Sequence, residues 1–219
     1  GAAERLSLSP VDLGRIRARF WYVSLPGRSY TLMPRILSAA RRAGVRVALN
    51  PSGLHLTEGR TALLASLKYL AVLVLNASEA ALLTGVTSSS EREVFDRLDE
   101  LVPGIVAVTD GARGVTVSDG RLLYRSGIFP ERRLVDRTGA GDAFGSGFVS
   151  GLVMTGETCV HGSCNPEAIS YAIRLGSANA TSVVEQLGAT AGILLSGAVD
   201  TLPRFKRLSI ETERRDHAA

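Results

Sequence analysis

Short apolar runs alternate with segments of helical periodicity along most of this 219-residue chain. Residues 71–75 (AVLVL) are apolar at every position, which is typical of a strand buried on both faces of a parallel sheet. We expect further strands over residues 20–25, 45–49, 105–109 and 132–135. Strands and helices that alternate through short connections predict an α/β fold, with a mostly parallel sheet covered by helices on both faces.

Helical spacing and turn residues fill the segments between these strands. A helix is expected to start near Met33 and stop at Gly44. Others are expected over residues 57–67, 77–83, 91–101, 139–153 and 166–184. Residues 114–124 resemble a hairpin with its turn at Asp119-Gly120. We expect one domain over residues 1–210 and a charged tail over residues 211–219, which lack apolar periodicity.

Composition narrows the class of protein. With 45% hydrophobic and 21% charged residues, the chain has the balance of a folded domain. Its longest apolar run, residues 70–75, is far shorter than the roughly 18 to 20 residues that cross a bilayer, and no secretory signal opens the sequence. We therefore expect no membrane partner and a cytoplasmic location. The net charge of +4 comes from scattered residues, so nucleic acid is not an expected partner either.

Two cysteines and a histidine, Cys159, His161 and Cys164, lie close together and raise the possibility of a metal site. A structural zinc site usually needs four ligands. No second cluster of ligands follows in the sequence, so we expect these residues to have no metal-binding role.

The stretch 136–144 (DRTGAGDAF) carries most of the chemical information. Gly139 and Gly141 allow a tight turn that would expose backbone N–H groups at a helix N-terminus, where an anion such as phosphate is stabilised. Asp142 would lie in the first helical turn and could accept a proton from an attacking hydroxyl. The alternative is that Asp142 only complements the helix dipole and the glycines only make a turn.

Two other nucleotide-binding patterns fit less well. Gly139, Gly141 and Gly145 follow the spacing G-x-G-x-x-x-G, but a dinucleotide fingerprint needs an acidic residue at the end of the next strand, about 20 residues on. Here a polar loop around His161 and another helix follow instead. The chain has no G-x-x-x-x-G-K-[ST] sequence, so a Walker P-loop is absent.

The string DRTGAGDAFGSGF closely resembles the second signature of the ribokinase/PfkB carbohydrate kinase family. Residues 72–85 (VLVLNASEAALLTG) are similar to that family's strand, N-x-x-E motif and following helix, and residues 109–114 (TDGARG) to its T-x-G-x-x-G loop. Residues 50–51, 178–180 and 188–189 resemble further family positions. The resemblance runs from about residue 20 to residue 189.

This resemblance implies a three-layer αβα ribokinase-like fold and transfer of the γ-phosphoryl group of ATP to a hydroxyl of a sugar or sugar-like substrate. Asp142 would be the general base. The backbone N–H groups of Gly139, Ala140, Gly141 and Asp142 would form the anion hole for the phosphoryl oxygens.

The resemblance also implies roles outside that turn. Asn76 and Glu79 would hold Mg²⁺ through water, although the same pair is also the pattern of a helix capping box. Asp136 and Thr138 would support a monovalent cation such as K⁺. The nucleotide-binding residues would be Asn76, Thr109, Gly111, Gly114 and, on the adenine side, Asn179.

The Gly-rich amino-terminal signature of the family, its sugar-gripping residues and its lid strands are missing from this sequence. The chain therefore resembles the carboxy-terminal two thirds of a family member. We expect it to need a missing amino-terminal half or a homodimer partner, because the sheet would otherwise keep an exposed edge. We also expect negligible kinase activity from the 219 residues alone. The alternative is a non-catalytic nucleotide-binding relative or inactive fragment of the same fold.

Overall fold

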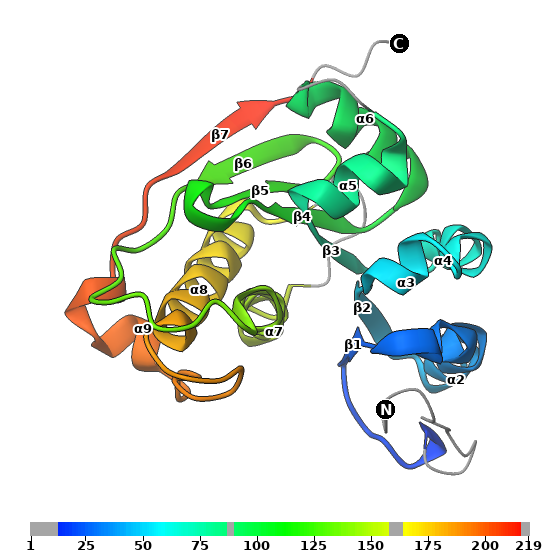
Figure 1. The fold of residues 1–219 in the computed structure, drawn as a ribbon, viewed down its shortest axis with the longest axis horizontal. Coiled ribbons are helices and arrows are strands. Elements are labelled where there is room, and N and C mark those ends of the chain that lie inside the picture. The colour runs from blue at the N-terminus through cyan, green and yellow to red at the C-terminus, as the bar shows by residue number, and fades with distance from the viewer. Residues whose placement is uncertain (1–12, 87–89, 158–163, 216–219) are drawn as a thin grey trace. The chain divides into compact units, whose positions relative to one another are not determined.

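The computed structural model describes residues 13–86, 90–157 and 164–215 (Figure 1). The chain divides into two compact units, Gly1–Val106 and Ala107–Ala219, and the boundary falls inside strand β4 (Ile105–Thr109). Among the described residues, hydrogen bonds join seven strands into one sheet in the order β1-β2-β3-β4-β5-β6-β7. A sheet of this kind with helices packed along it confirms the predicted α/β class.

The first unit contains the parallel part of the sheet. Its strands β1 (Phe20–Ser24), β2 (Arg46–Asn50) and β3 (Val72–Asn76) lie side by side and run in the same direction. Leu49 of β2 pairs with Leu73 of β3, and both side chains are completely buried. The continuous apolar run in β3 is therefore covered on both faces, as the sequence predicted.

Helices connect these strands. Their bounds are Met33–Ala43 for α2, Gly53–Leu56 for α3, Arg60–Leu67 for α4, Ala77–Thr84 for α5 and Glu91–Leu101 for α6, with a short 3₁₀ segment η2 at Gly27–Leu32. Helix α2 ends where Gly44 takes a left-handed conformation, as expected. The single helix predicted over residues 57–67 was wrong at its start. The chain forms α3 first, because Ser52 and His55 make a reciprocal capping box.

The second unit begins with the predicted hairpin. Strands β5 (Val115–Ser118) and β6 (Leu122–Ser126) pair in antiparallel fashion. The carboxylate of Asp119 accepts the backbone N–H groups of Arg121 and Leu122 at 2.9 and 2.7 Å, which closes the turn. The hydroxyl of buried Tyr124 donates to the same carboxylate, and burial raises the pKa of Tyr124.

Two sequence predictions fail in this unit. Residues 211–219 were expected to form a tail outside the fold, but strand β7 (Ile210–Arg214) pairs antiparallel with β6. Its side chains are mostly exposed, so hydrophobic periodicity could not reveal it; backbone pairing and an ion pair of 2.7 Å between Arg125 and Glu213 hold it instead. The strand predicted over residues 132–135 is absent. The amides of Val135 and Asp136 donate to the carbonyl of Val184 at a helix end, and not to a neighbouring strand.

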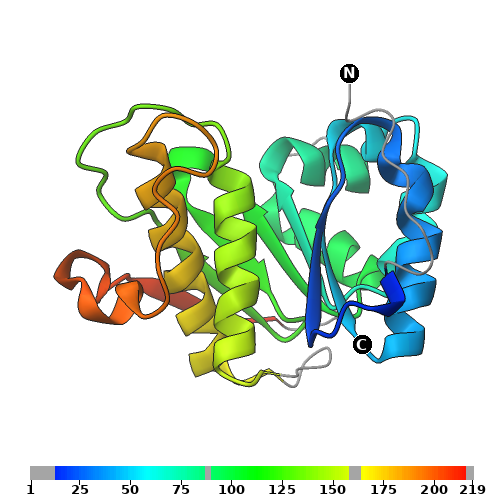
Figure 2. The same ribbon diagram turned by 90° about the horizontal axis from the view of Figure 1, so that it is seen from below.

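Helices α7 (Ala140–Met154) and α8 (Pro166–Val184) were both predicted, and Figure 2 shows them packed side by side. Small residues let their backbones approach closely. A Cβ atom added at Gly151 would lie 2.6 Å from the Cα of Ala172, and one at Gly176 would lie 2.9 Å from the carbonyl oxygen of Phe144. This packing fixes the start of α7 relative to the end of α8.

The carboxy-terminal part of the second unit packs onto α8. Helix α9 (Ala198–Thr201) is followed by the 3₁₀ segment η4 (Pro203–Phe205). Phe205 forms a buried cluster with Phe129, Ala178 and Val199.

Two sequence-based exclusions concern membranes and metals. None of the helices within the described ranges is long and apolar enough to span a bilayer. Cys164 is buried, while Cys159 and His161 lie outside the described residues, so the prediction made for this cluster stays a prediction.

Candidate active site

The glycine turn before α7 has the conformation that the sequence predicted. Gly139 is the N-cap of α7 and is left-handed, with φ of +81°. A Cβ atom at this position would lie 2.8 Å from the Cα, Cβ and carbonyl oxygen of Ala189. Glycine is therefore required twice, because of the backbone conformation and because of the close approach of another segment.

Asp136 fastens this turn. One of its carboxylate oxygens accepts the backbone N–H of Thr138 at 2.9 Å, and the other accepts the backbone N–H of Gly188 at 3.1 Å. These bonds, the one from Thr138 first, lower the pKa of Asp136. Asp136 thus joins the glycine turn to the loop that contains Gly188 and Ala189. The K⁺-supporting role of Asp136 and Thr138 stays a prediction.

Asp142 lies in the first turn of α7, and its residue is exposed to solvent. No side chain caps this helix. The amide of Ala140 donates over 3.3 Å to the carbonyl of Arg137 within the turn, so that donor is partly used. Gly141 follows as the second residue of the helix. The helix dipole gives this end a partial positive charge next to the carboxylate.

The loop after β4 forms a second tight structure. Its 3₁₀ turn η3 (Gly111–Arg113) is closed by a hydrogen bond of 2.8 Å from the Asp110 amide to the Gly114 carbonyl. The guanidinium of Arg113 makes two bonds to the carboxylate of Asp110, at 2.6 and 2.8 Å. Gly114 has φ of +98°, and a Cβ atom there would collide with the carbonyl oxygen of Ser126. This close approach allows no larger residue.

Both glycine structures border one cavity of about 270 Å³ in the second unit. Thr109, Gly111 and Gly114 line it from the loop after β4. Ala140, Gly141 and Phe144 line it from the first turns of α7. The cavity thus unites five residues that the sequence analysis had assigned to nucleotide or phosphate binding. Asp142 is not among the lining residues and lies beside the cavity, on the same helical turn.

The remaining walls contain residues that the sequence analysis missed. Ser177, Ala180, Thr181 and Val184 of α8 line the cavity, and their spacing of three and four residues is that of one helical face. Helical spacing predicts that these residues share a face, but they form no sequence motif that indicates a binding role. Ile128, Glu131 and Leu134 come from an irregular segment that has no periodicity to detect.

Arg137 was also missed, although it lies inside the DRTGAGD string. It is exposed and lines the cavity next to the glycine turn. In the part of the chain that the structure describes, its guanidinium has no ion-pair partner. A cation in this place favours an anionic ligand in the cavity. The sequence did carry a signal for Arg137, because a cationic side chain stands two residues before the glycine turn that was predicted to bind phosphate.

Asn179 does not line the cavity. Its side chain is buried, its amide nitrogen donates to the carbonyl of Ala143 at 2.8 Å, and its amide oxygen accepts the backbone N–H of Leu194 at 2.9 Å. The structure thus places Asn179 as a bridge from α8 to α7 and to the loop around Leu194. The adenine contact predicted for it stays a prediction that this arrangement does not favour.

Asn76 and Glu79 lie in the first unit, at the end of β3. They form the capping box that was the structural alternative: the backbone N–H of Asn76 donates to Glu79 Oε2 at 2.8 Å, and the backbone N–H of Glu79 donates to Asn76 Oδ1 at 2.9 Å. Among the described residues, no group of three or more His, Cys, Asp or Glu side chains could hold a metal ion. Mg²⁺ usually keeps several waters and needs few protein ligands, so oxygen donors such as these two remain suitable.

Comparisons with known proteins agree with this geometry. Residues 10–194 match the model of the pfkB family carbohydrate kinases. A ribokinase from Haemophilus influenzae is 30% identical over 158 residues, which cover 70% of this chain and 46% of the relative.

Solved structures show the same fold. A probable sugar kinase from Rhizobium etli aligns with a TM-score of 0.71 at 23% identity, over 90% of this chain and 58% of that one. A Burkholderia thailandensis nucleoside kinase, solved with inosine, aligns with a TM-score of 0.66 at 24% identity, over 89% of this chain and 58% of that one. The predicted three-layer ribokinase-like fold is thereby confirmed.

The chain spans about half the length of the relatives that it matches. The family match, in contrast, covers most of the chain and includes both glycine structures and the cavity between them. This chain belongs to the pfkB family of carbohydrate kinases.

Proposed function

We propose that this chain supplies the nucleotide-binding half and the general base of an ATP-dependent kinase, which phosphorylates a hydroxyl of a sugar or nucleoside. The observation that carries the proposal is the arrangement at the start of α7. Ala140 and Gly141 line a cavity, while the exposed carboxylate of Asp142 lies on the same turn outside it. A donor nucleotide and an acceptor hydroxyl could therefore approach the same helix end from two sides.

The chemistry of the cavity fits a nucleotide. Much of its lining is apolar, with Ile128, Leu134, Phe144 and Val184 among the larger side chains. Such a surface suits a planar base, since stacking and burial need no charged partner. The polarised helix end and Arg137 lie at the glycine turn, where they would attract phosphates. One cavity thus offers an apolar region for a base and a positively polarised edge for a phosphate chain.

Asp142 would act in the transfer step as a proton acceptor. The acceptor hydroxyl loses its proton to the Asp142 carboxylate as its oxygen forms a bond to the γ-phosphorus. The bond from that phosphorus to the β,γ-bridging oxygen breaks, and ADP leaves with the electron pair. Backbone N–H groups at the start of α7 stabilise the negative charge on the transferred oxygens. The glycine turn keeps these donors in place before the reaction, because Asp136 and Ala189 fix its conformation.

Mg²⁺, when bound, neutralises phosphate charge. Asn76 and Glu79 are our candidates for holding it, through water, because they offer amide and carboxylate oxygens at the end of β3. The acceptor class in this proposal comes from the names of the relatives, a ribokinase and a nucleoside kinase.

The direct test is Asp142→Asn in the natural protein that contains this chain. The substitution removes the proton acceptor but keeps the shape of the side chain. We expect kcat to fall by about two to four orders of magnitude, while the Kd for ATP stays within about twofold of the wild-type value. An unchanged kcat would contradict the assignment of Asp142 as the base. Glu167→Gln, which removes an exposed carboxylate from the first turn of α8, outside the cavity lining, serves as the matched control.

The 219-residue chain by itself is proposed to bind nucleotide without turning it over, because it spans only about half of its relatives. Thermal stabilisation by Mg-ATP, and not by NAD, is the expected result. Stabilisation by NAD alone would favour an oxidoreductase. Robust ADP formation with a sugar or nucleoside by this chain would show that the acceptor site is already complete.

A further inference from the structure

One wall of the cavity lacks regular secondary structure. We name residues 127–138 the wall segment; it contributes Ile128, Glu131, Leu134 and Arg137 to the cavity lining. Most of its residues are exposed, including Leu134 at 47% and Val135 at 44%, and Phe129 is its one buried side chain. A segment with few buried contacts opens easily unless other parts of the molecule hold it.

The end of α8 holds this wall segment. The carboxylate of Glu185 accepts the backbone N–H of Arg132 at 2.7 Å. The side chain of Arg133 donates to the backbone carbonyl of Glu185 at 3.3 Å. The neighbouring carbonyl of Val184 accepts the two amides of Val135 and Asp136. At this end of α8, the Glu185 carboxylate is thus the side-chain acceptor for the wall segment, and the other acceptors are the backbone carbonyls of Val184 and Glu185.

Arg204 holds Glu185 in turn. Its guanidinium donates one hydrogen bond to each carboxylate oxygen of Glu185, at 3.0 and 2.9 Å. The Glu185 side chain is only 10% exposed, and the guanidinium of Arg204 lies 4.2 Å from the ring centroid of Phe205. Burial alone would raise the pKa of Glu185, but the bonds from Arg204 and from the Arg132 amide outweigh it and lower the pKa. The carboxylate is thus charged and fixed in one orientation.

Phe205 gives the same region a second, apolar link. Its ring packs edge-on against that of Phe129, with 5.1 Å between the centroids. Phe129 is buried and lies next to Ile128, which lines the cavity. The segment of α9 and η4, residues 198–205, therefore contacts the wall segment through Arg204 and through Phe205.

We infer that Glu185, oriented by Arg204, is a positioning residue of the nucleotide cavity, which sets the affinity of the cavity by fixing the backbone of the wall segment. Glu185 lies outside the lining residues and touches no ligand in this account. It acts through the backbone of Arg132. The inference rests on the proposed function, because it takes the ligand of the cavity to be a nucleotide.

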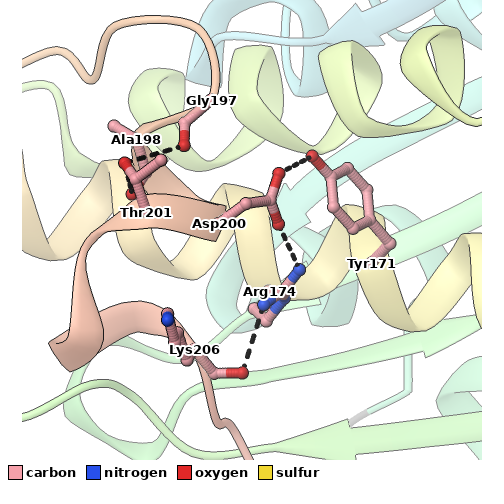
Figure 3. A network of polar contacts seen from close by, with 7 residues as sticks. All are labelled: Tyr171, Arg174, Gly197, Ala198, Asp200, Thr201 and Lys206. Atoms are coloured by element: carbon pink, nitrogen blue, oxygen red, sulfur yellow. Dashed lines mark hydrogen bonds and ion pairs between the residues drawn. The ribbon is translucent and has the colours of Figure 1, made fainter.

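A neighbouring network offers a matched control (Figure 3). Asp200 of α9 accepts a hydrogen bond from the Tyr171 hydroxyl at 3.0 Å and pairs with Arg174 at 2.7 Å. Arg174 also donates to the carbonyl of Lys206 at 3.1 Å. These contacts fasten the same carboxy-terminal segment to α8, but none of the bonds drawn in Figure 3 goes to the wall segment. Removal of Asp200 should therefore weaken the attachment of α9 to α8 but keep the hydrogen bond between Glu185 and the wall segment.

The test compares Glu185→Ala with Asp200→Ala in the 219-residue chain. The first readout is the Kd for ADP by calorimetry. We expect Glu185→Ala to raise it about tenfold, the loss that corresponds to one charge-assisted hydrogen bond, and Asp200→Ala to leave it within about twofold. Glu185→Gln keeps an oxygen that can accept the Arg132 amide, so its Kd should lie between the two. Arg204→Lys keeps the charge but loses the paired geometry, and should also be intermediate.

Hydrogen exchange at the Arg132 amide, measured without nucleotide, is the second readout. It should become faster in Glu185→Ala and stay at the wild-type rate in Asp200→Ala. An unchanged Kd in Glu185→Ala, or an equal rise in both alanine variants, would overturn the inference. If the wild-type chain fails to bind ADP at all, the proposed function fails, and Arg132 exchange still reports separately whether Glu185 fixes the wall.

Discussion

The two glycines of the DRTGAGD turn should respond in opposite ways to the same substitution. Gly141 has an ordinary helical backbone, and a Cβ atom there would meet nothing within 4 Å. Alanine is more favourable than glycine inside a helix by about 0.5–1 kcal/mol. Gly141→Ala should therefore raise the free energy of unfolding by up to that amount. The new methyl group would stand in the space beside Gly141, at the edge of the cavity.

Gly139→Ala should instead destabilise the fold. The left-handed conformation costs a non-glycine residue about 1–2 kcal/mol. The Cβ atom would also lie 2.8 Å from three atoms of Ala189, and such overpacking costs about 1–3 kcal/mol. The two terms together predict a loss of about 2–5 kcal/mol in the free energy of unfolding.

Urea unfolding and ATP titration of both variants separate stability from binding. If the turn binds phosphate, Gly141→Ala raises the Kd for ATP about tenfold or more although the protein is at least as stable as the wild type. The Kd for adenosine should change much less, because we propose the apolar part of the cavity as the site of the base. A Gly141→Ala variant with wild-type affinity for ATP would refute a phosphate site at this turn. It would leave the glycines as turn residues alone.

Three further predictions concern charge. Arg137→Ala should weaken ATP binding about tenfold and leave adenosine binding nearly unchanged, and the effect should shrink with added salt; equal losses for both ligands in calorimetry would argue against a phosphate contact. Because the pKa of Glu185 is lowered in the folded state, its contribution to stability is present above its ordinary value of 4.5 and lost as the pH falls below it. The difference in free energy of unfolding between wild type and Glu185→Gln should shrink over that range; a difference independent of pH would contradict the ion pair. Asp136→Asn keeps an oxygen for Thr138 but loses the charge, so acid unfolding should be less steep than in the wild type.

Several features of this fold follow from local patterns in the sequence. Helix α8 was predicted with its bounds correct, because Pro166 stands at its first position and helical periodicity continues past Gly176 as far as Val184. The buried strand β3 and the hairpin at Asp119 were also visible, one from its continuous apolar run and the other from its turn residues.

Other features depend on contacts between distant residues, which a pattern along the chain does not show. Strand β7 has mostly exposed side chains and is held by pairing with β6. The wall segment looked like a strand because Leu134 and Val135 are apolar, yet both are exposed and the backbone bonds to the end of α8. Asn179 was assigned to adenine by resemblance, and only the fold shows both ends of its amide engaged inside the protein.

The candidate site also has a part that the sequence predicted and a part that it did not. Its glycine turns were predicted, because positive φ and close approach require glycine at Gly139 and Gly114. The cavity between them was not, since its lining comes from four separate segments of the chain.

A crystal structure of the chain with a non-hydrolysable ATP analogue and Mg²⁺ would test the central claim most directly. We expect the base to lie among the apolar side chains of the cavity and the terminal phosphate to lie within hydrogen-bond distance of the Gly141 amide. The carboxylate of Asp142 should face the γ-phosphorus from the other side of the turn. A nucleotide bound elsewhere, or a phosphate chain directed away from α7, would contradict it.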